Sequence, residues 1–134
     1  MANPVSLLLD THVLVWMASD PKRLSAKARE AIRHARQHSG VAIATITLWE
    51  LAWLAHSGRL QVLNSVEAFV RETVARVILK PMTPEITAVA VRLPIGYPKD
   101  PADRVIASTA IVEGMPLVTA DHQIRRSKAV ETIW

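Results

Sequence analysis

Short apolar runs alternate along the chain with longer segments of helical periodicity, and this alternation restricts the fold more than any other feature. Strands that are apolar on both faces need cover on both sides, and a helix between two strands acts as a crossover that makes them parallel. The sequence therefore predicts an α/β fold, a three-layer α/β/α sandwich with a mostly parallel central sheet of four or five strands. The predicted strands are residues 5–9, 41–44, 77–79, 117–119 and, at the edge, 130–133.

The helices between these strands are predicted from apolar spacing and from residues that start or stop a helix. Thr83-Pro84 and Asp100-Pro101 each place a capping side chain before a proline, which is favoured in the first helical turn. Gly58 and Gly114 are predicted to end helices because glycine tolerates the left-handed conformation. The predicted helices are residues 25–38, 47–57, 65–75, 84–93 and 101–113, with a short one after Asp121.

The composition favours a small cytoplasmic protein. The chain has 134 residues, half of them hydrophobic, which suffices for a core, and we expect a single domain over residues 1–134. It has no cysteine, which excludes disulfides, zinc-thiolate sites and a cysteine nucleophile and suits a reducing compartment. No basic residue precedes Lys22, and Asp10 interrupts the first apolar stretch, so neither a signal peptide nor a membrane-spanning helix is predicted.

Four acidic residues fall where parallel sheets bind ligands, beyond the carboxyl ends of the strands. Asp10 directly follows the first strand, Asp121 follows the fourth, and Glu50 and Asp103 lie in the first turns of two helices. Carboxylates brought together repel, so they take up protons or share a cation, and their hard oxygen ligands suit Mg²⁺ or Mn²⁺. A net charge of +4 favours polyanions such as nucleic acid. The pattern predicts metal-assisted hydrolysis of phosphodiesters.

Each acid also fits a purely structural interpretation. Thr47 and Glu50 have the spacing of a capping box, in which the glutamate bonds back to the start of its helix. Asp103 would stabilise its helix by placing negative charge near the N-terminus, and Asp121 would serve as an N-cap. Asp10 fits such an interpretation least well, because it joins an apolar strand to an apolar helix and an unpaired buried charge is costly.

No other catalytic motif stands out in the chain. The five histidines show no metal-ligand spacing, the four glycines form no phosphate-binding loop, and no serine has the setting of a hydrolase nucleophile. Trp49 and Trp53 lie four residues apart on one predicted helix. This spacing favours a core or partner-binding role over a platform for stacking bases.

Five short motifs occur in an order seen in one family, and together they span nearly the whole chain. They are Leu8-Leu9-Asp10-Thr11-His12, Trp49-Glu50-Leu51-Ala52, Gly58-Arg59-Leu60, Asp100-Pro101-Ala102-Asp103-Arg104 and Leu117-Val118-Thr119-Ala120-Asp121. On these motifs the chain resembles the PIN-domain ribonucleases, specifically the VapC-like toxins of type II toxin-antitoxin systems.

The resemblance implies a metal-dependent endoribonuclease that hydrolyses RNA at a carboxylate-bound Mg²⁺ or Mn²⁺ site and is masked by a cognate antitoxin. Asp10, Glu50, Asp103 and Asp121 match the acidic quartet of the family as catalytic and metal-binding residues. Thr11, Asp100 and Thr119 match supporting positions. RNA and the antitoxin are then the expected partners, and a homodimer is left open.

Two departures from the family pattern reduce the number of basic residues expected near this site. Leu54 stands where a basic residue is common, and Tyr97-Pro98-Lys99 replaces a frequent His-Arg pair. The remaining candidates for binding RNA phosphate are Lys99, Arg104 and Arg125. One alternative hypothesis is a catalytically weak PIN scaffold that binds RNA or its antitoxin. Another is a phosphoryl-transfer protein, which the missing second acid of a D-x-D motif disfavours.

Overall fold

All five strands lie in one parallel sheet, in the order β3-β2-β1-β4-β5. The computed structural model describes residues 6–94 and 96–134, so Val5, predicted to begin the first strand, lies outside the described residues. The fold class predicted from the sequence is confirmed. The strands are β1 (Leu7–Leu9), β2 (Val41–Ala44), β3 (Ile78–Lys80), β4 (Leu117–Val118) and β5 (Thr132–Ile133).

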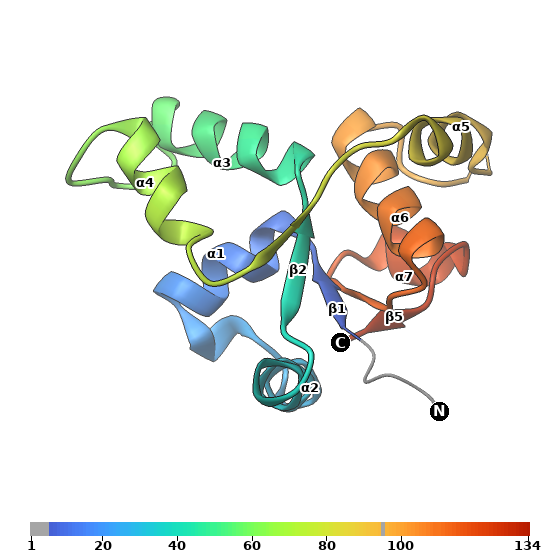
Figure 1. The fold of residues 1–134 in the computed structure, drawn as a ribbon, viewed down its shortest axis with the longest axis horizontal. Coiled ribbons are helices and arrows are strands. Elements are labelled where there is room, and N and C mark those ends of the chain that lie inside the picture. Colours follow the sequence, from blue (N-terminus) through green and yellow to red (C-terminus); the bar gives the residue numbers. More distant parts are fainter. Residues whose placement is uncertain (1–5, 95) are drawn as a thin grey trace.

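Helices cover both faces of this sheet, and Figure 1 shows the two helical layers on either side of β1 and β2. One layer holds α1 (Thr11–Ser19), a short 3-10 turn (Pro21–Arg23), α2 (Ala26–Gln37), α3 (Ile46–His56) and α4 (Val66–Thr73). The other holds α5 (Pro84–Arg92), α6 (Pro101–Glu113) and α7 (His122–Ser127). In the part of the chain that the structure describes, no helix is long and apolar enough to span a membrane.

Successive strand residues point into two separate cores, as side chains of a strand must. Leu7 and Leu9 of β1 pack into the core formed with α1 and α2. Leu8, between them, packs against Ile106 of α6 and Ile124 of α7. The continuous apolar strands of the sequence are therefore explained by burial on both faces.

The helix caps agree closely with the sequence signals. The Ser25, Ser65 and Thr83 hydroxyl oxygens each accept a hydrogen bond from a backbone N–H in the first turn of the following helix, at 3.0–3.2 Å. Gly114 ends α6 in the left-handed conformation, with φ of 69°. The boundaries differ slightly: α4 ends at Thr73 rather than near residue 75, and β3 begins one residue late.

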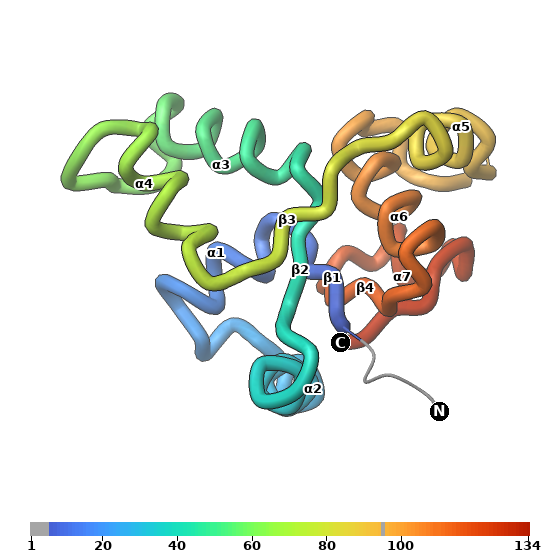
Figure 2. The backbone as a smooth tube through the Cα atoms, in the orientation of Figure 1, coloured from blue at the N-terminus to red at the C-terminus, as the bar shows by residue number. Residues whose placement is uncertain are grey.

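The tube in Figure 2 shows how the chain divides around the central strand. From β1 the chain runs to β2 and then β3 at one edge of the sheet, whereas β4 and β5 lie on the other side of β1. The carboxyl ends of β1 and β4 are neighbours, because Asp10 N–H donates to the Val118 carbonyl at 3.0 Å. The strand order therefore reverses between β1 and β4.

We expect Gly114→Ala to lower the free energy of unfolding by about 1 kcal/mol, because an L side chain is strained at a positive φ. Space is not the limit, since nothing lies within 4 Å of the added Cβ at this position. Gly96→Ala is the matched control, because that site is equally open and has no positive φ in the left-handed range. Urea unfolding measures both variants, and an equal change in the two would contradict the interpretation.

Candidate active site

A cleft of about 340 Å³ lies at the carboxyl ends of β1 and β4. Ligands in open parallel sheets bind at this kind of position, where the strand order reverses. The structure brings the four predicted acids together there and adds Asp100, which the sequence placed in a supporting role. The acids that line the cleft are Asp10, Glu50, Asp100, Asp103 and Asp121.

Asp10 is the most deeply placed of these acids, with only 8% of its surface exposed. It caps α1, and its Oδ1 accepts a hydrogen bond from Thr11 N–H at 2.8 Å. Its Oδ2 accepts from the Thr119 hydroxyl, also at 2.8 Å. Burial raises the pKa of Asp10 above its ordinary value, and these two hydrogen bonds oppose the rise. Thr119, expected in a supporting position, thus contacts Asp10 directly.

Glu50 is not part of a capping box, and that interpretation is wrong. α3 begins at Ile46, one residue earlier than predicted, so Thr47 lies inside the helix and Glu50 is beyond its first turn. The Thr11 hydroxyl instead donates to Glu50 Oε1 and lies 3.0 Å from the Thr47 hydroxyl. Burial raises the pKa of Glu50, and the negative charge of Asp10 adds to the rise. Thr11 therefore contacts two acids of the cleft.

The N-terminus of α6 brings two further acids to the cleft. Asp100 caps the helix, accepting a hydrogen bond from Ala102 N–H at 2.8 Å. Asp103 follows three residues later, and burial raises its pKa to about 7, with the negative charges of Asp10 and Asp100 adding to the rise. A shift of this size at a helix N-terminus, where a carboxylate is normally stabilised, reflects the strength of the desolvation and crowding.

Asp121 has the N-cap role that the sequence allowed and also lines the cleft. Its Oδ1 accepts hydrogen bonds from Gln123 N–H at 2.8 Å and Ile124 N–H at 3.0 Å, both in α7. Its own backbone N–H donates to the Thr119 hydroxyl at 3.1 Å. Buried Thr119 accordingly links the ends of β1 and β4 through Asp10 and Asp121.

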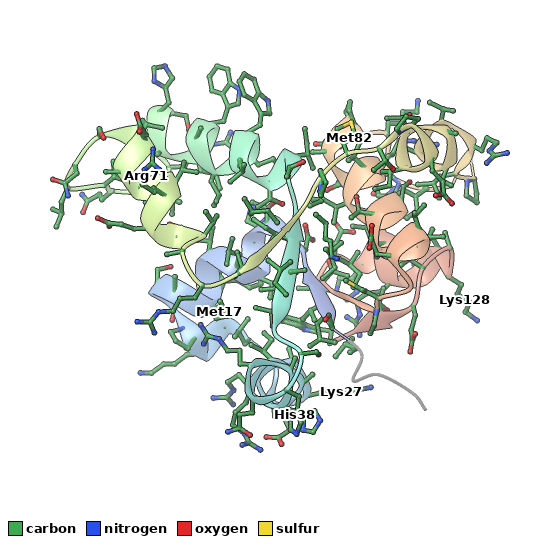
Figure 3. The ribbon with its side chains drawn as sticks, in the orientation of Figure 1. Met17, Lys27, His38, Arg71, Met82 and Lys128 are labelled. Atoms are coloured by element: carbon green, nitrogen blue, oxygen red, sulfur yellow. The ribbon has the colours of Figure 1, made fainter. Side chains whose placement is uncertain are left out.

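The basic candidates are placed differently from one another. The Arg104 guanidinium donates to the backbone carbonyls of Ala90 and Leu93, at 3.0 and 2.9 Å, and fixes the segment between α5 and α6. These bonds favour a structural role over phosphate binding. Lys99 is exposed beside Asp100, and Arg125 is half-buried on α7. Figure 3 shows that the nearby Lys128 points away from the body of the protein.

Two residues near the cleft have roles that their sequence positions did not reveal. Tyr97, in the stretch that departs from the family pattern, is only 1% exposed and belongs to the core around α6. His12 lines the cleft, although its spacing matched no metal-binding motif. The sequence feature that could have identified His12 as a cleft residue is its position two residues after Asp10, in the first turn of α1.

The donor set fits a hard divalent cation. Carboxylate oxygens are the ligands that Mg²⁺ and Mn²⁺ prefer. Burial raises the pKa of Asp10, Glu50 and Asp103, and neighbouring carboxylates add to each rise, so a bound cation would stabilise the ionised acids. Over residues 6–94 and 96–134, no group of three or more His, Asp or Glu side chains already has metal-binding geometry. The fit therefore rests on chemistry and charge rather than on a preformed coordination shell.

A second cleft, of about 540 Å³, adjoins the acidic one. Trp49 and Trp53 line it from α3, with 60% and 50% of their surfaces exposed. Of the two roles predicted for these side chains, the core role is wrong, and the partner-binding role stays a prediction. α3 buries Leu51 and Ala55 instead, which lie on its opposite side.

A parallel α/β/α sandwich with an acidic cleft at its switch point defines a class of PIN-like nucleases, and comparisons with known proteins agree. A family model described as PIN domain matches residues 7–129. The chain is 41% identical over 131 residues to Ribonuclease VapC22 of Mycobacterium tuberculosis (strain ATCC 25618 / H37Rv). The matched region covers 96% of this chain and 98% of that protein. The chain belongs to the PIN-domain family and, within it, to the VapC-type ribonucleases.

Solved structures share the fold at lower identity. The structure of VapBC2 from Rickettsia felis bound to a DNA fragment from its promoter has a TM-score of 0.72 at 18% identity, covering 94% of this chain and 96% of that one. DNA-bound VapBC from Salmonella typhimurium gives 0.73 at 18% identity, covering 96% and 97%. These likenesses concern the arrangement of helices and strands.

The raised pKa of Asp103 makes the stability of the metal-free protein depend on pH. In the unfolded chain this carboxyl ionises near its ordinary value of 3.8, whereas in the folded protein it ionises near 7. Between those values the folded state holds the extra proton, so the free energy of unfolding falls as the pH rises. In EDTA, wild type should therefore lose stability relative to Asp103→Asn between about pH 4 and pH 7.

Thermal unfolding across this pH range measures the difference. Asp20→Asn is the matched control, because Asp20 is an exposed acid at the far end of α1. Its unfolding curve should follow that of wild type at every pH. A constant offset between wild type and Asp103→Asn from pH 4 to 7 would contradict the assigned shift.

Proposed function

We propose that this protein is a metal-dependent endoribonuclease, the toxin of a toxin-antitoxin pair, and that it cuts RNA at the acidic cleft between the ends of β1 and β4. The observation that carries the proposal is the gathering of Asp10, Glu50, Asp103 and Asp121 around one cleft. Its support is the relationship to Ribonuclease VapC22 over nearly the whole chain.

In this proposal Asp10 and Asp103 are the leading ligands of Mg²⁺ or Mn²⁺, and Glu50 and Asp121 complete the set or orient a water molecule. Such an ion, when bound, supplies the charge that activates water and stabilises the leaving oxygen of a phosphodiester. The chain's own contribution is to hold the acids in place. Thr119 fixes Asp10 Oδ2 and Thr11 fixes Glu50 Oε1, so these two threonines are positioning residues.

The proposed partner is a cognate antitoxin. Related solved structures contain VapBC and other toxin-antitoxin complexes, including one from Klebsiella pneumoniae with a TM-score of 0.61 at 24% identity. The acidic cleft would attract a basic side chain of such a protein, because its crowded carboxylates lack a cation of their own. Masking of the cleft by an antitoxin and binding of a metal would then compete for the same carboxylates.

Purified protein freed of any partner should cleave RNA in Mg²⁺ or Mn²⁺ and stop in EDTA. Asp10→Asn and Asp103→Asn should each reduce cleavage by orders of magnitude, because each removes a ligand. Asp103→Asn should nevertheless keep or gain thermal stability without metal, since it relieves burial of charge among like charges. Asp20→Asn serves again as the control and should cleave like wild type.

The outcomes separate a metal site from helix caps. Mn²⁺ should raise the unfolding temperature of wild type, because a ligand that binds only the folded state stabilises it. If Asp103 were merely a favourable charge at a helix start, its replacement would cost about 0.3–1 kcal/mol and leave cleavage intact. Undiminished cleavage in EDTA would overturn the proposal.

Expression of the chain alone should slow bacterial growth, and co-expression of the antitoxin encoded beside it should restore growth. Asp103→Asn at the same protein level should not slow growth, because the effect is assigned to cleavage. Growth curves with immunoblots for protein amount are the measurement. Normal growth with intact wild-type protein present would contradict the toxin assignment.

A further inference from the structure

We infer that the cleft lined by Trp49, Trp53 and Arg59 binds an unpaired base of the RNA, next to the phosphate that is cut. This inference rests on the proposed function and assigns a second element of substrate recognition to the same site. For convenience this cleft is called the indole cleft, and its defining residues are Trp49, Trp53, Leu54, Arg59 and Pro101.

The indole cleft and the acidic cleft share a wall. His12, Glu50 and Asp100 line both of them. Glu50 and Trp53 lie three residues apart on α3, so they are neighbours on the helix surface. A chain whose phosphate occupies the acidic cleft therefore has its adjacent nucleotide within reach of the indoles. The volume of about 540 Å³ suits a nucleotide-sized ligand.

The two indoles have the geometry of a stacking site. Their ring centroids are 5.6 Å apart with the planes at 88°, an edge-to-face pair. In such a pair the ring that presents its edge keeps both faces free of the other ring. Trp53 also meets His56 edge-on, at 5.6 Å and 76°. Two exposed tryptophans on one helix face are costly in water, and every nucleobase has a π-face that can cover them.

Arg59 favours nucleic acid as the occupant over an apolar peptide, whereas Glu50 and Asp100 lie on the wall shared with the acidic cleft. Arg59 lies at the cleft and has no ion pair among the salt bridges of the described residues, so its charge is available to a phosphate. Figure 3 shows side chains projecting from the side of α3 that faces away from the sheet, where a strand of RNA could pass. The combination of aromatic faces with a cation beside them is typical of single-strand binding.

The occupant must be unpaired. A base inside a duplex is already stacked on its neighbours, whereas a base in a loop or single strand can leave the stack and lie against an aromatic side chain. The indole cleft thus selects single-stranded segments or loops without reading a particular base. Phosphate contacts at the proposed metal site carry no sequence information, so the indole cleft would be what confines cleavage to accessible parts of an RNA.

The test compares Trp49→Leu and Trp53→Leu with Trp49→Phe and Trp53→Phe. Leucine keeps an apolar side chain, whereas phenylalanine keeps a π-face. Cleavage of a dye-labelled single-stranded RNA is measured in Mn²⁺. Binding of the same RNA with a non-hydrolysable linkage at the cleaved position is measured by fluorescence anisotropy, also in Mn²⁺. Each leucine variant should weaken binding and raise KM by about 5- to 100-fold with kcat little changed, and the phenylalanine variants should recover most of the loss.

The same binding measurement is repeated with an RNA that has an abasic nucleotide beside the cleaved phosphate, so that the loss of the indole and the loss of the base can be compared singly and together. Wild type should bind it as weakly as Trp53→Leu binds the normal RNA, and Trp53→Leu should lose nothing further. Val91→Ala is the control, because Val91 is an exposed apolar side chain on α5, which does not line either cleft.

The two proposals fail in different ways. Absence of metal-dependent cleavage by wild type overturns the nuclease assignment. Cleavage by wild type with unchanged KM and binding in both leucine variants overturns the indole cleft as an RNA site. Unchanged RNA binding together with a weakened antitoxin complex or a lost homodimer would instead assign the two indoles to a protein interface.

Discussion

The candidate site of this protein depends on the burial and mutual repulsion of carboxylates at the carboxyl ends of β1 and β4. Asp10 is held at the end of the central strand β1, where desolvation raises its pKa. Every other acid in the cleft increases the cost of ionising its neighbours, and Asp103 shows the largest effect. Such an arrangement lowers the stability of the metal-free protein near neutral pH, which is the cost that the proposed metal site would offset. A shared cation converts the same repulsion into a binding site.

Sheet topology explains why the acids meet even though they come from distant parts of the sequence. β1 pairs with β2 on one side and β4 on the other, so the residues that follow β1 and β4 are neighbours. The hydrogen bond from Thr119 to Asp10 joins positions 109 residues apart in sequence. Thr11 makes the corresponding link to α3 through Glu50. Both threonines use short, stiff side chains, which define the position of an acid better than a flexible donor would.

The sequence predicted the features that depend on local chemistry and periodicity. Buried strands, helix caps and the placement of Asp10, Asp103 and Asp121 at one edge follow from apolar runs and from residues such as Pro101. It could not resolve features that depend on which helix face meets the sheet. Glu50 matched a capping box, but α3 starts at Ile46 and turns the glutamate toward Thr11 instead. The exposure of Trp53 was missed for the same reason, since an almost wholly apolar helix has no clear inner face in sequence.

α3 is apolar on two sides because one side packs into the core and the other lines the indole cleft. Its inner side must bury Leu51 against the core, whereas its outer side forms the indole cleft. Glu50 lies between these two sides and faces the acids. Within the eight residues from Thr47 to Leu54, this one helix supplies a core contact, a carboxylate and an aromatic surface. Because these roles occupy different faces, a substitution at Trp53 can alter substrate binding while Leu51 preserves the packing and Glu50 the charge of the site.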